Sequence, residues 1–169
     1  MMNIYVASSW RNDFQPATVR ALAEAGHRVY DFRHPGVDDS DFHWSGISKG
    51  WRGWSLVDFV KALRHDLAVD GFDKDMTGML IADACVMVLP CGRSAHLEAG
   101  WFVGKGRKLY IYVPQDLSDR GDLWEAELMY KMADGIFNNI DDIIEKLGET
   151  TIQSVEKSLE GMGYGKVDE

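Results

Sequence analysis

The chain has 169 residues, of which 46% are hydrophobic and 27% charged, and its formal net charge is −9. A chain of this length fits one domain that buries about two-thirds of its unfolded surface, without a metal or disulfide to hold it together. Proteins that bind the phosphate backbone usually carry a basic face, so the acidic balance argues against a nucleic-acid partner. A small anionic ligand held by a few local donors remains compatible with this charge.

The chain shows no pattern typical of export or of membrane insertion. Residues 1–5 contain no basic segment followed by a long apolar stretch. No apolar run approaches the roughly 18 residues that a membrane span needs. The two cysteines, Cys85 and Cys91, form no CxxC pair, and Cys85 lies in an apolar run typical of a core thiol. We therefore expect a cytoplasmic protein that does not associate with membranes.

The first third of the chain predicts a strand, a helix and a strand, followed by a long loop. Residues 4–7 and 28–32 are β-prone, and residues 12–25 carry apolar side chains near helical spacing up to Gly26. Such a unit of about 30 residues is typical of a right-handed βαβ crossover. Residues 33–55 are rich in glycine and tryptophan, which favours a functional loop over a disordered one.

The rest of the chain alternates helical and β-prone segments. Residues 84–89 are a continuous apolar run that ends at Pro90, as expected for a strand buried on both faces. The other expected elements are helices over 56–68, 73–82, 95–103, 122–133 and 140–147, strands over 108–113 and 135–137, and a last helical face at Ile152, Val155 and Leu159 before a glycine-containing tail.

This alternation predicts an α/β fold with a doubly wound, flavodoxin-like or Rossmann-like sheet of five parallel strands and helices on both faces. We assign residues 1–150 to this domain and residues 151–169 to a C-terminal helix and flexible tail. Ligands of such sheets bind beyond the carboxyl ends of the strands, where the strand order reverses. Two segments are therefore expected there, and their ligand-binding candidates are Ser8, Ser9, Trp10 and Arg11 after the first strand, and Cys91, Gly92, Arg93, Ser94, His96 and Glu98 after the third.

Glu98 is the first catalytic candidate. With Ser94 as the N-cap, a capping box would use position 97, so Glu98 comes one residue too late for that role. It is expected one turn into the helix among apolar neighbours, where a carboxylate is costly unless it is paired or used in chemistry. This pattern alone leaves the catalytic and the structural interpretation open.

Asp75 is the second candidate carboxylate, and its alternative interpretation is a solvated helix face. The five histidines are scattered without the spacing of metal ligands. The chain also lacks a dinucleotide fingerprint, a Walker-type loop and a GxSxG elbow. The sequence therefore predicts neither a metal site nor a cofactor.

Four segments, in this order along the chain, together resemble nucleoside 2-deoxyribosyltransferases. Residues 4–10 (IYVASSW) resemble the opening strand and loop of that family, and residues 75–79 (DMTGM) resemble its Asp-Leu-x-Gly-Ile segment. Residues 94–100 (SAHLEAG) resemble the loop and helix that carry the nucleophilic glutamate. Residues 127–129 (ELM) resemble a segment that reaches into a neighbouring subunit's site.

The resemblance implies a role for each matched residue. Glu98 would attack the anomeric carbon, Tyr5 would orient its carboxylate, and Asp75 would pass a proton to the base. Trp10 would pack on that base. These roles agree with the chemistry, because cleavage of an N-glycosidic bond builds positive charge on the sugar and negative charge on the leaving base.

The same resemblance implies a homodimer or a larger homo-oligomer with shared sites, since Glu127 and Met129 would enter the site of a partner chain. In the tryptophan-rich loop, we expect Trp44, Trp51 or Trp54 to close over the base or sugar.

Departures from the transferase pattern define an alternative. Gly92 stands where many transferases have an aspartate six residues before the nucleophile and where the related hydrolases tend to have a serine. Ser9 and Arg11 resemble the related 2′-deoxynucleoside 5′-monophosphate N-glycosidases, which bind a phosphate. Ser94, His96 and the first amides of the helix would also suit a phosphate.

We expect an enzyme of nucleotide salvage that transfers a sugar from a nucleoside to an acceptor base. The alternative enzyme takes a nucleoside 5′-monophosphate and transfers the sugar to water. A non-catalytic nucleotide-binding or sensor domain is a third hypothesis, and the joint presence of Tyr5, Asp75 and Glu98 argues against it.

Overall fold

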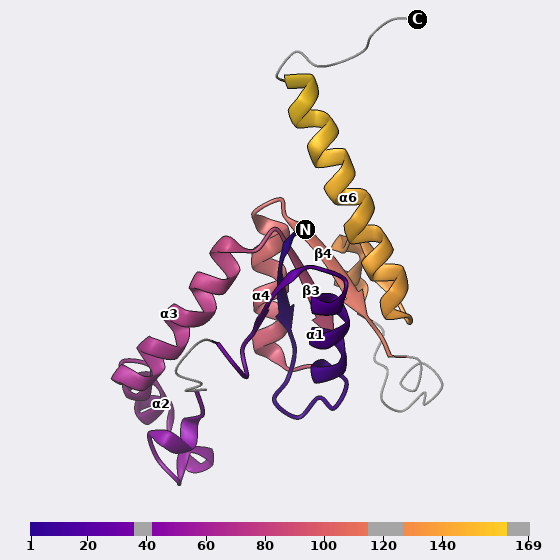
Figure 1. The fold of residues 1–169 in the computed structure, drawn as a ribbon. Coiled ribbons are helices and arrows are strands. Elements are labelled where there is room, and N and C mark those ends of the chain that lie inside the picture. Colours follow the sequence, from indigo (N-terminus) through magenta and orange to yellow (C-terminus); the bar gives the residue numbers. More distant parts are fainter. Residues whose placement is uncertain (36–41, 115–126, 162–169) are drawn as a thin grey trace, which may run out of the picture.

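A five-stranded parallel sheet forms the centre of the computed structural model, which describes residues 1–35, 42–114 and 127–161 (Figure 1). The strand order β2-β1-β3-β4-β5 confirms the predicted doubly wound fold, because it reverses between β1 and β3. The strands are β1 (Asn3–Ala7), β2 (Arg28–Asp31), β3 (Ala84–Val88), β4 (Lys108–Tyr112) and β5 (Gly135–Phe137).

Helices cover both faces of the sheet (Figure 1). On one face, Leu22 of α1 (Gln15–Glu24) and Ile143 of α6 (Ile140–Gly161) pack against the strands. On the other face, Met79 of α3 (Asp66–Ile81) and Phe102 of α4 (Arg93–Gly104) do so. The α2 helix (Leu56–Ala62) and the start of α3 project beyond the sheet.

Successive side chains of β1 point to opposite faces of the sheet, so only every second residue can contact α3 and α4. Ile4 and Val6 belong to the core under α1 and α6. Tyr5 and Ala7 point the other way, into the core under α3 and α4. Tyr5 therefore lies on the same face of the sheet as the helices that carry Asp75 and Glu98.

The boundary between α2 and α3 differs from the prediction. The α2 helix ends at Ala62 rather than at residue 68, and α3 already begins at Asp66 rather than at residue 73. At the start of α3, the His65 side chain accepts a hydrogen bond from the amide of Leu67. Gly71, which lies between the two predicted helices, is inside α3. A Cβ at this position would lie 2.7 Å from Cβ of Phe42, so the glycine allows the preceding loop to pack closely on the helix.

Other predicted boundaries are also corrected by local contacts. The first helix begins at Gln15 instead of residue 12, because Oδ1 of Asn12 accepts the amides of Phe14 and Gln15. Gly92 occupies the N-cap of α4, so the prediction of Ser94 as its N-cap is wrong.

Towards the C-terminus, the structure differs from two of the predicted helices, one in its type and the other in its length. The described part of the predicted helix 122–133 is a short 3-10 turn, η3 (Leu128–Met132), and residues 122–126 lie outside the described ranges. The helix predicted to end at 147 continues unbroken to Gly161 as α6, so the predicted domain limit at residue 150 falls inside a helix. Within the described ranges, no helix is both long and apolar enough to cross a membrane.

Candidate active site

The ends of β1 and β3 are tied together at the point where the strand order reverses. Oγ of Ser8 donates a 2.9 Å hydrogen bond to the carbonyl oxygen of Val88. The Asn12 side chain donates to the same carbonyl at 3.1 Å and to that of Pro90 at 3.0 Å. The two segments predicted to form the site are therefore adjacent and are held by direct hydrogen bonds.

Two carboxyls face each other on this side of the sheet, Glu98 from α4 and Asp75 from α3. Burial raises the pKa of Glu98 to about 7, with a further increase from the charge of Asp75, while the Tyr5 hydroxyl lowers it. Burial also raises the pKa of Asp75, and a hydrogen bond from Tyr30 lowers it. Both carboxyls thus hold their protons to higher pH than an exposed carboxyl does, and a protonated and an ionised carboxyl side by side can serve as acid and nucleophile.

Two tyrosines, Tyr5 and Tyr30, lie beside the carboxyl pair. Tyr5 is fully buried, and burial followed by the charges of Glu98 and Asp75 raises its pKa. Its hydroxyl has no hydrogen-bond partner of standard geometry in the described ranges, so its contact with Glu98 is looser than a standard hydrogen bond. Tyr30 donates a 3.0 Å hydrogen bond to Oδ1 of Asp75. Both hydroxyls stay protonated and can act as donors to the carboxyls.

Sequence reasoning missed Tyr30. The sequence alone contains no signal for it, since only the folded chain defines the parallel register of β1 and β2 that places Tyr30 directly beside Tyr5. Their rings stack with centroids 5.2 Å apart and 9° between the planes. This stacking places Tyr30 beside the carboxyl pair, where its hydroxyl reaches Asp75.

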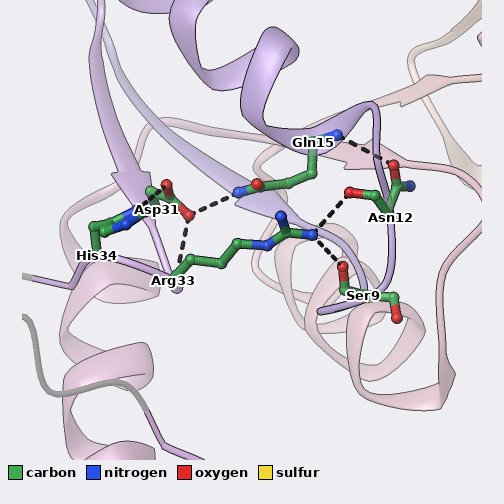
Figure 2. A network of polar contacts seen from close by, with 6 residues as sticks. All are labelled: Ser9, Asn12, Gln15, Asp31, Arg33 and His34. Carbon is green, nitrogen blue, oxygen red and sulfur yellow. Dashed lines mark hydrogen bonds and ion pairs between the residues drawn. The ribbon is translucent and has the colours of Figure 1, made fainter.

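Arg33 was also missed, and Figure 2 shows that it fixes the loop after β1. Its Nη2 donates to the carbonyl oxygens of Ser9 and Asn12, at 2.8 Å each. The guanidinium also lies 5.9 Å from the ring centroid of Trp10. The chain from 9 to 12 therefore has a defined shape, and Trp10 stays 41% exposed and available to a planar ligand.

The network in Figure 2 continues to Asp31, which ends β2. Its Oδ1 accepts the side-chain amide of Gln15 at 2.7 Å and the backbone amide of Arg33 at 3.0 Å, and its Oδ2 lies 3.1 Å from Nδ1 of His34. Asp31 therefore joins the ends of β2 and α1, and the Arg33 guanidinium makes no ion pair with a carboxylate in the described ranges.

His96 is engaged by its own protein. Its Nδ1 lies 2.8 Å from the carbonyl oxygen of Gly92 and its Nε2 3.0 Å from the Tyr130 hydroxyl. The carbonyl can only accept, so Nδ1 carries a proton and donates it. The ring also stacks on Tyr130, which joins α4 to η3. A ligand could use Nε2 of His96 only in competition with Tyr130.

The remaining predicted ligand-binding residues of the two segments lie at the open edge of the site. Arg11 is exposed, and its guanidinium has no hydrogen bond or ion pair in the described part of the chain. Oγ of Ser9 lies 3.3 Å from the amide of Arg11 and accepts from it. Gly92 and Ser94 are exposed at the start of α4. A ligand could reach all four residues, and no ligand role is established for any of them.

The tryptophans of the long loop form a separate aromatic cluster. Trp44 makes edge contacts with Phe42, Trp54 and Phe59, at centroid distances of 4.7, 5.7 and 5.6 Å. Trp51 packs instead against His43, with Arg52 over its ring. These contacts fix the loop on α2, and the prediction that one of these tryptophans covers a ligand stays a prediction.

Glu127 and Met129 are placed on the other side of His96, where η3 begins. Glu127 is the residue before the 3-10 turn and is exposed, and Met129 is 60% exposed. The buried Tyr130 between them and the sheet holds this turn against α4. The Glu127 carbonyl oxygen accepts the amide of Tyr130 at 3.1 Å, and the entry of Glu127 and Met129 into a partner's site stays a prediction.

Taken together, these contacts define an α/β protein with a coupled acid pair at the switch point of its sheet. No family model and no curated protein matches the chain. Among solved structures, it is similar to a 2-deoxyribosyltransferase from the psychrotolerant bacterium Bacillus psychrosaccharolyticus, with 19% identity and a TM-score of 0.56 over 83% of this chain and 89% of that one. A conserved protein from Enterococcus faecalis V583 matches with 13% identity and a TM-score of 0.48 over 89% of this chain and 99% of that one.

At these identities the likeness concerns the fold. The fold of the chain is that of a 2-deoxyribosyltransferase structure, as the sequence motifs led us to expect.

Proposed function

We propose that the chain cleaves the N-glycosidic bond of a deoxynucleoside and transfers the sugar to an acceptor base, with Glu98 as the nucleophile. The observation that carries this proposal is the coupled pair of partly buried carboxyls, Glu98 and Asp75, at the switch point of the sheet. Carboxyls with raised pKa values at the ligand-binding edge of such a sheet are candidates for a functional site. The fold similarity to a 2-deoxyribosyltransferase supports the same reaction class.

The reaction proceeds in two displacements. A Glu98 carboxylate oxygen bonds to the anomeric carbon while the C–N bond breaks, and the electron pair of that bond leaves with the base, which takes a proton from Asp75. A nitrogen of the acceptor base then attacks the anomeric carbon, the Glu98 carboxylate leaves, and the proton displaced from the acceptor returns to Asp75. Tyr5 orients the Glu98 carboxylate, and Trp10 packs on the base.

A second candidate is hydrolysis of a nucleoside 5′-monophosphate, with water in place of the acceptor base. The observation in its favour is the exposed guanidinium of Arg11 beside Ser9, with no acid paired to it in the described ranges. A guanidinium offers paired donors that suit a phosphate. Ser94 and the first amides of α4 lie across the site and would add further donors.

We further propose a homo-oligomer in which Glu127 and Met129 enter a partner's site. The support comes from the projecting α2–α3 arm, because monomeric proteins rarely expose large contiguous apolar surface. The exposed large hydrophobic residues of this arm, residues 56–72, are Leu56, Val57, Phe59, Val60, Leu63, Leu67, Val69 and Phe72.

A panel assay tests the function. The protein is incubated with deoxynucleosides, ribonucleosides and their 5′-monophosphates, with and without a second base, and free or exchanged base is measured by chromatography. Base exchange on nucleosides supports the transferase, and base release from monophosphates alone supports the hydrolase. If no compound in the panel loses its base, the proposed function is wrong.

A further inference from the structure

Tyr30 contributes a hydroxyl to the site that neither the fold comparison nor the sequence motifs assign. It belongs to β2, the edge strand, and its hydroxyl donates 3.0 Å to Oδ1 of Asp75 on α3. Its ring stacks flat on Tyr5 on one side. Against the ring also lies Gly78 of α3, where a Cβ would come within 2.6 Å of the ring carbons. The hydroxyl is thus held in place from three elements.

This geometry distinguishes the two oxygens of Asp75. In a protonated carboxyl, the carbonyl oxygen is the hydrogen-bond acceptor and the other oxygen carries the proton. Because Oδ1 accepts from Tyr30, it takes the carbonyl role when Asp75 is protonated. Building on the proposed function, we infer that Tyr30 is a positioning residue that keeps the transferable proton of Asp75 on Oδ2.

The placement of Asp75 makes this selection necessary. Asp75 lies one turn before Gly78 on α3. Because Gly78 has no side chain, α3 packs directly on the Tyr30 ring, and the Tyr30 hydroxyl reaches Asp75. A freely rotating carboxyl would present either oxygen to the base. A carboxyl fixed by Tyr30 presents one oxygen, which removes the entropy cost of orientation before the base is protonated.

Titratable groups from three neighbouring elements lie around Asp75. Tyr30 comes from β2, Tyr5 from β1 and Glu98 from α4. On α3 itself, Lys74 is paired with Asp70 at 2.8 Å. The further neighbours within reach of these groups are Asp31 beside Tyr30 and the thiols of Cys85 and Cys91 near Glu98.

Tyr30→Phe is the decisive variant, since it removes the hydroxyl and keeps the ring between Tyr5 and Gly78. The hydrogen bond from Tyr30 lowers the pKa of Asp75, so the variant should bind the Asp75 proton about three- to tenfold more tightly. The charge of Asp75 raises the pKa of Glu98, so Glu98 should at the same time lose its proton at lower pH. These two opposite shifts measure the effect of the Tyr30 hydroxyl on Asp75 and, through the charge of Asp75, on Glu98.

Carbon-13 NMR titration of the two carboxyls, assigned with Asp75→Asn and Glu98→Gln, measures both shifts without any substrate. Tyr110→Phe is the matched control, because it deletes a hydroxyl that also makes a 3.0 Å hydrogen bond, to Thr150, on the other face of the sheet. Unchanged titration of Asp75 in Tyr30→Phe overturns the inference. So does a shift of equal size in Tyr110→Phe.

Kinetics provide the second readout. With a substrate found in the panel assay, Tyr30→Phe should lower kcat about tenfold and leave KM nearly unchanged, since only proton delivery is affected. A raised KM with unchanged kcat contradicts a role in proton delivery. If the wild-type protein acts on no panel compound, the proposed function fails, whereas the NMR titration still decides whether Tyr30 controls Asp75.

Discussion

The guanidinium of Arg33 donates a 2.8 Å hydrogen bond to the carbonyl oxygen of Ser9. The bond crosses from the end of β2 to the loop that follows β1, and a second bond from the same nitrogen reaches Asn12. Side chains such as Trp10 can contact a ligand from a loop only if the loop is held, and Arg33 holds it.

We predict that Arg33→Met lowers the free energy of unfolding by about 2 kcal/mol, since hydrogen bonds from a charged donor contribute about 1.5–3 kcal/mol. KM for the nucleoside should rise more than kcat falls. Denaturant unfolding and steady-state kinetics measure the two effects. Arg28→Met is the control, because Arg28 is exposed at the start of the same strand. Equal losses in both variants would show that the loop does not depend on Arg33.

The pKa of Glu98 predicts how stability depends on pH. Its ordinary value of 4.5 is raised to about 7 in the folded protein, so the folded state binds more protons than the unfolded state between these two values. Stability from this group is fully present below pH 4.5 and is lost as the pH rises through 7. The loss amounts to about 3 kcal/mol, since each unit of pKa corresponds to about 1.4 kcal/mol.

Glu98→Gln should therefore be more stable than wild type at pH 8, and this difference should shrink as the pH falls toward 4.5. Thermal unfolding at a series of pH values measures the difference. Glu24→Gln, an exposed position at the end of α1, is the control and should show no such trend. A difference between Glu98→Gln and wild type that does not vary with pH would contradict the raised pKa.

Catalysis should depend on the same side chain. We predict that Glu98→Ala and Glu98→Gln fold normally and lose several orders of magnitude in turnover, because covalent catalysis is removed. The measurement is base release from the substrate identified in the panel assay. Turnover of Glu98→Ala within about tenfold of wild type rules out Glu98 as the nucleophile.

The sheet was predictable because its signals are local. The fully apolar run of β3 and the β-prone segment of β1 form strands with all or nearly all residues buried, as their patterns indicated. The break between α2 and α3 falls at residues 63–65, and apolar spacing did not locate it, because Gly71 lies inside α3, where it leaves room for Phe42 from a distant loop. The secondary structure of a single segment was thus easier to predict than the contacts between segments.

The same distinction applies to the candidate site. Glu98 and Asp75 stood out because a carboxylate among apolar neighbours is unusual in any sequence. Tyr30 and Arg33 did not stand out, since a tyrosine in a strand and an arginine after it are ordinary. Their significance depends on strand register and on backbone carbonyls 21 and 24 residues away, which only the folded chain defines.

The proposed homo-oligomer leads to a prediction about the α2–α3 arm. Val57 and Phe72 are 63% and 64% exposed, and a charge at either position should weaken an interface that covers this arm. We predict that Val57→Glu and Phe72→Glu shift sedimentation toward the monomer and reduce activity. Ile152→Glu, at an apolar position on α6 that is 59% exposed, should do neither. A fully active wild-type monomer at working concentration would contradict the shared site.

Arg11 decides between the two enzymatic proposals. Its exposed guanidinium follows β1 by four residues, at the open edge where the 5′ end of a substrate could lie. Charge-assisted hydrogen bonds to a phosphate contribute roughly 1.5–3 kcal/mol, so a 5′-monophosphate hydrolase should lose about tenfold or more in kcat/KM in Arg11→Ala. A transferase acting on nucleosides should barely respond, because a 5′-hydroxyl needs no cation.

The measurement compares kcat/KM for a deoxynucleoside and its 5′-monophosphate, in wild type and in Arg11→Ala. Arg20→Ala serves as the control, because Arg20 is exposed on α1 outside the two segments of the site. A loss confined to the monophosphate and to Arg11→Ala favours the hydrolase, since only that substrate has a group for the guanidinium to bind. Equal use of both substrates, unchanged by the substitution, eliminates a phosphate-binding role for Arg11 and leaves the transferase as the enzymatic proposal.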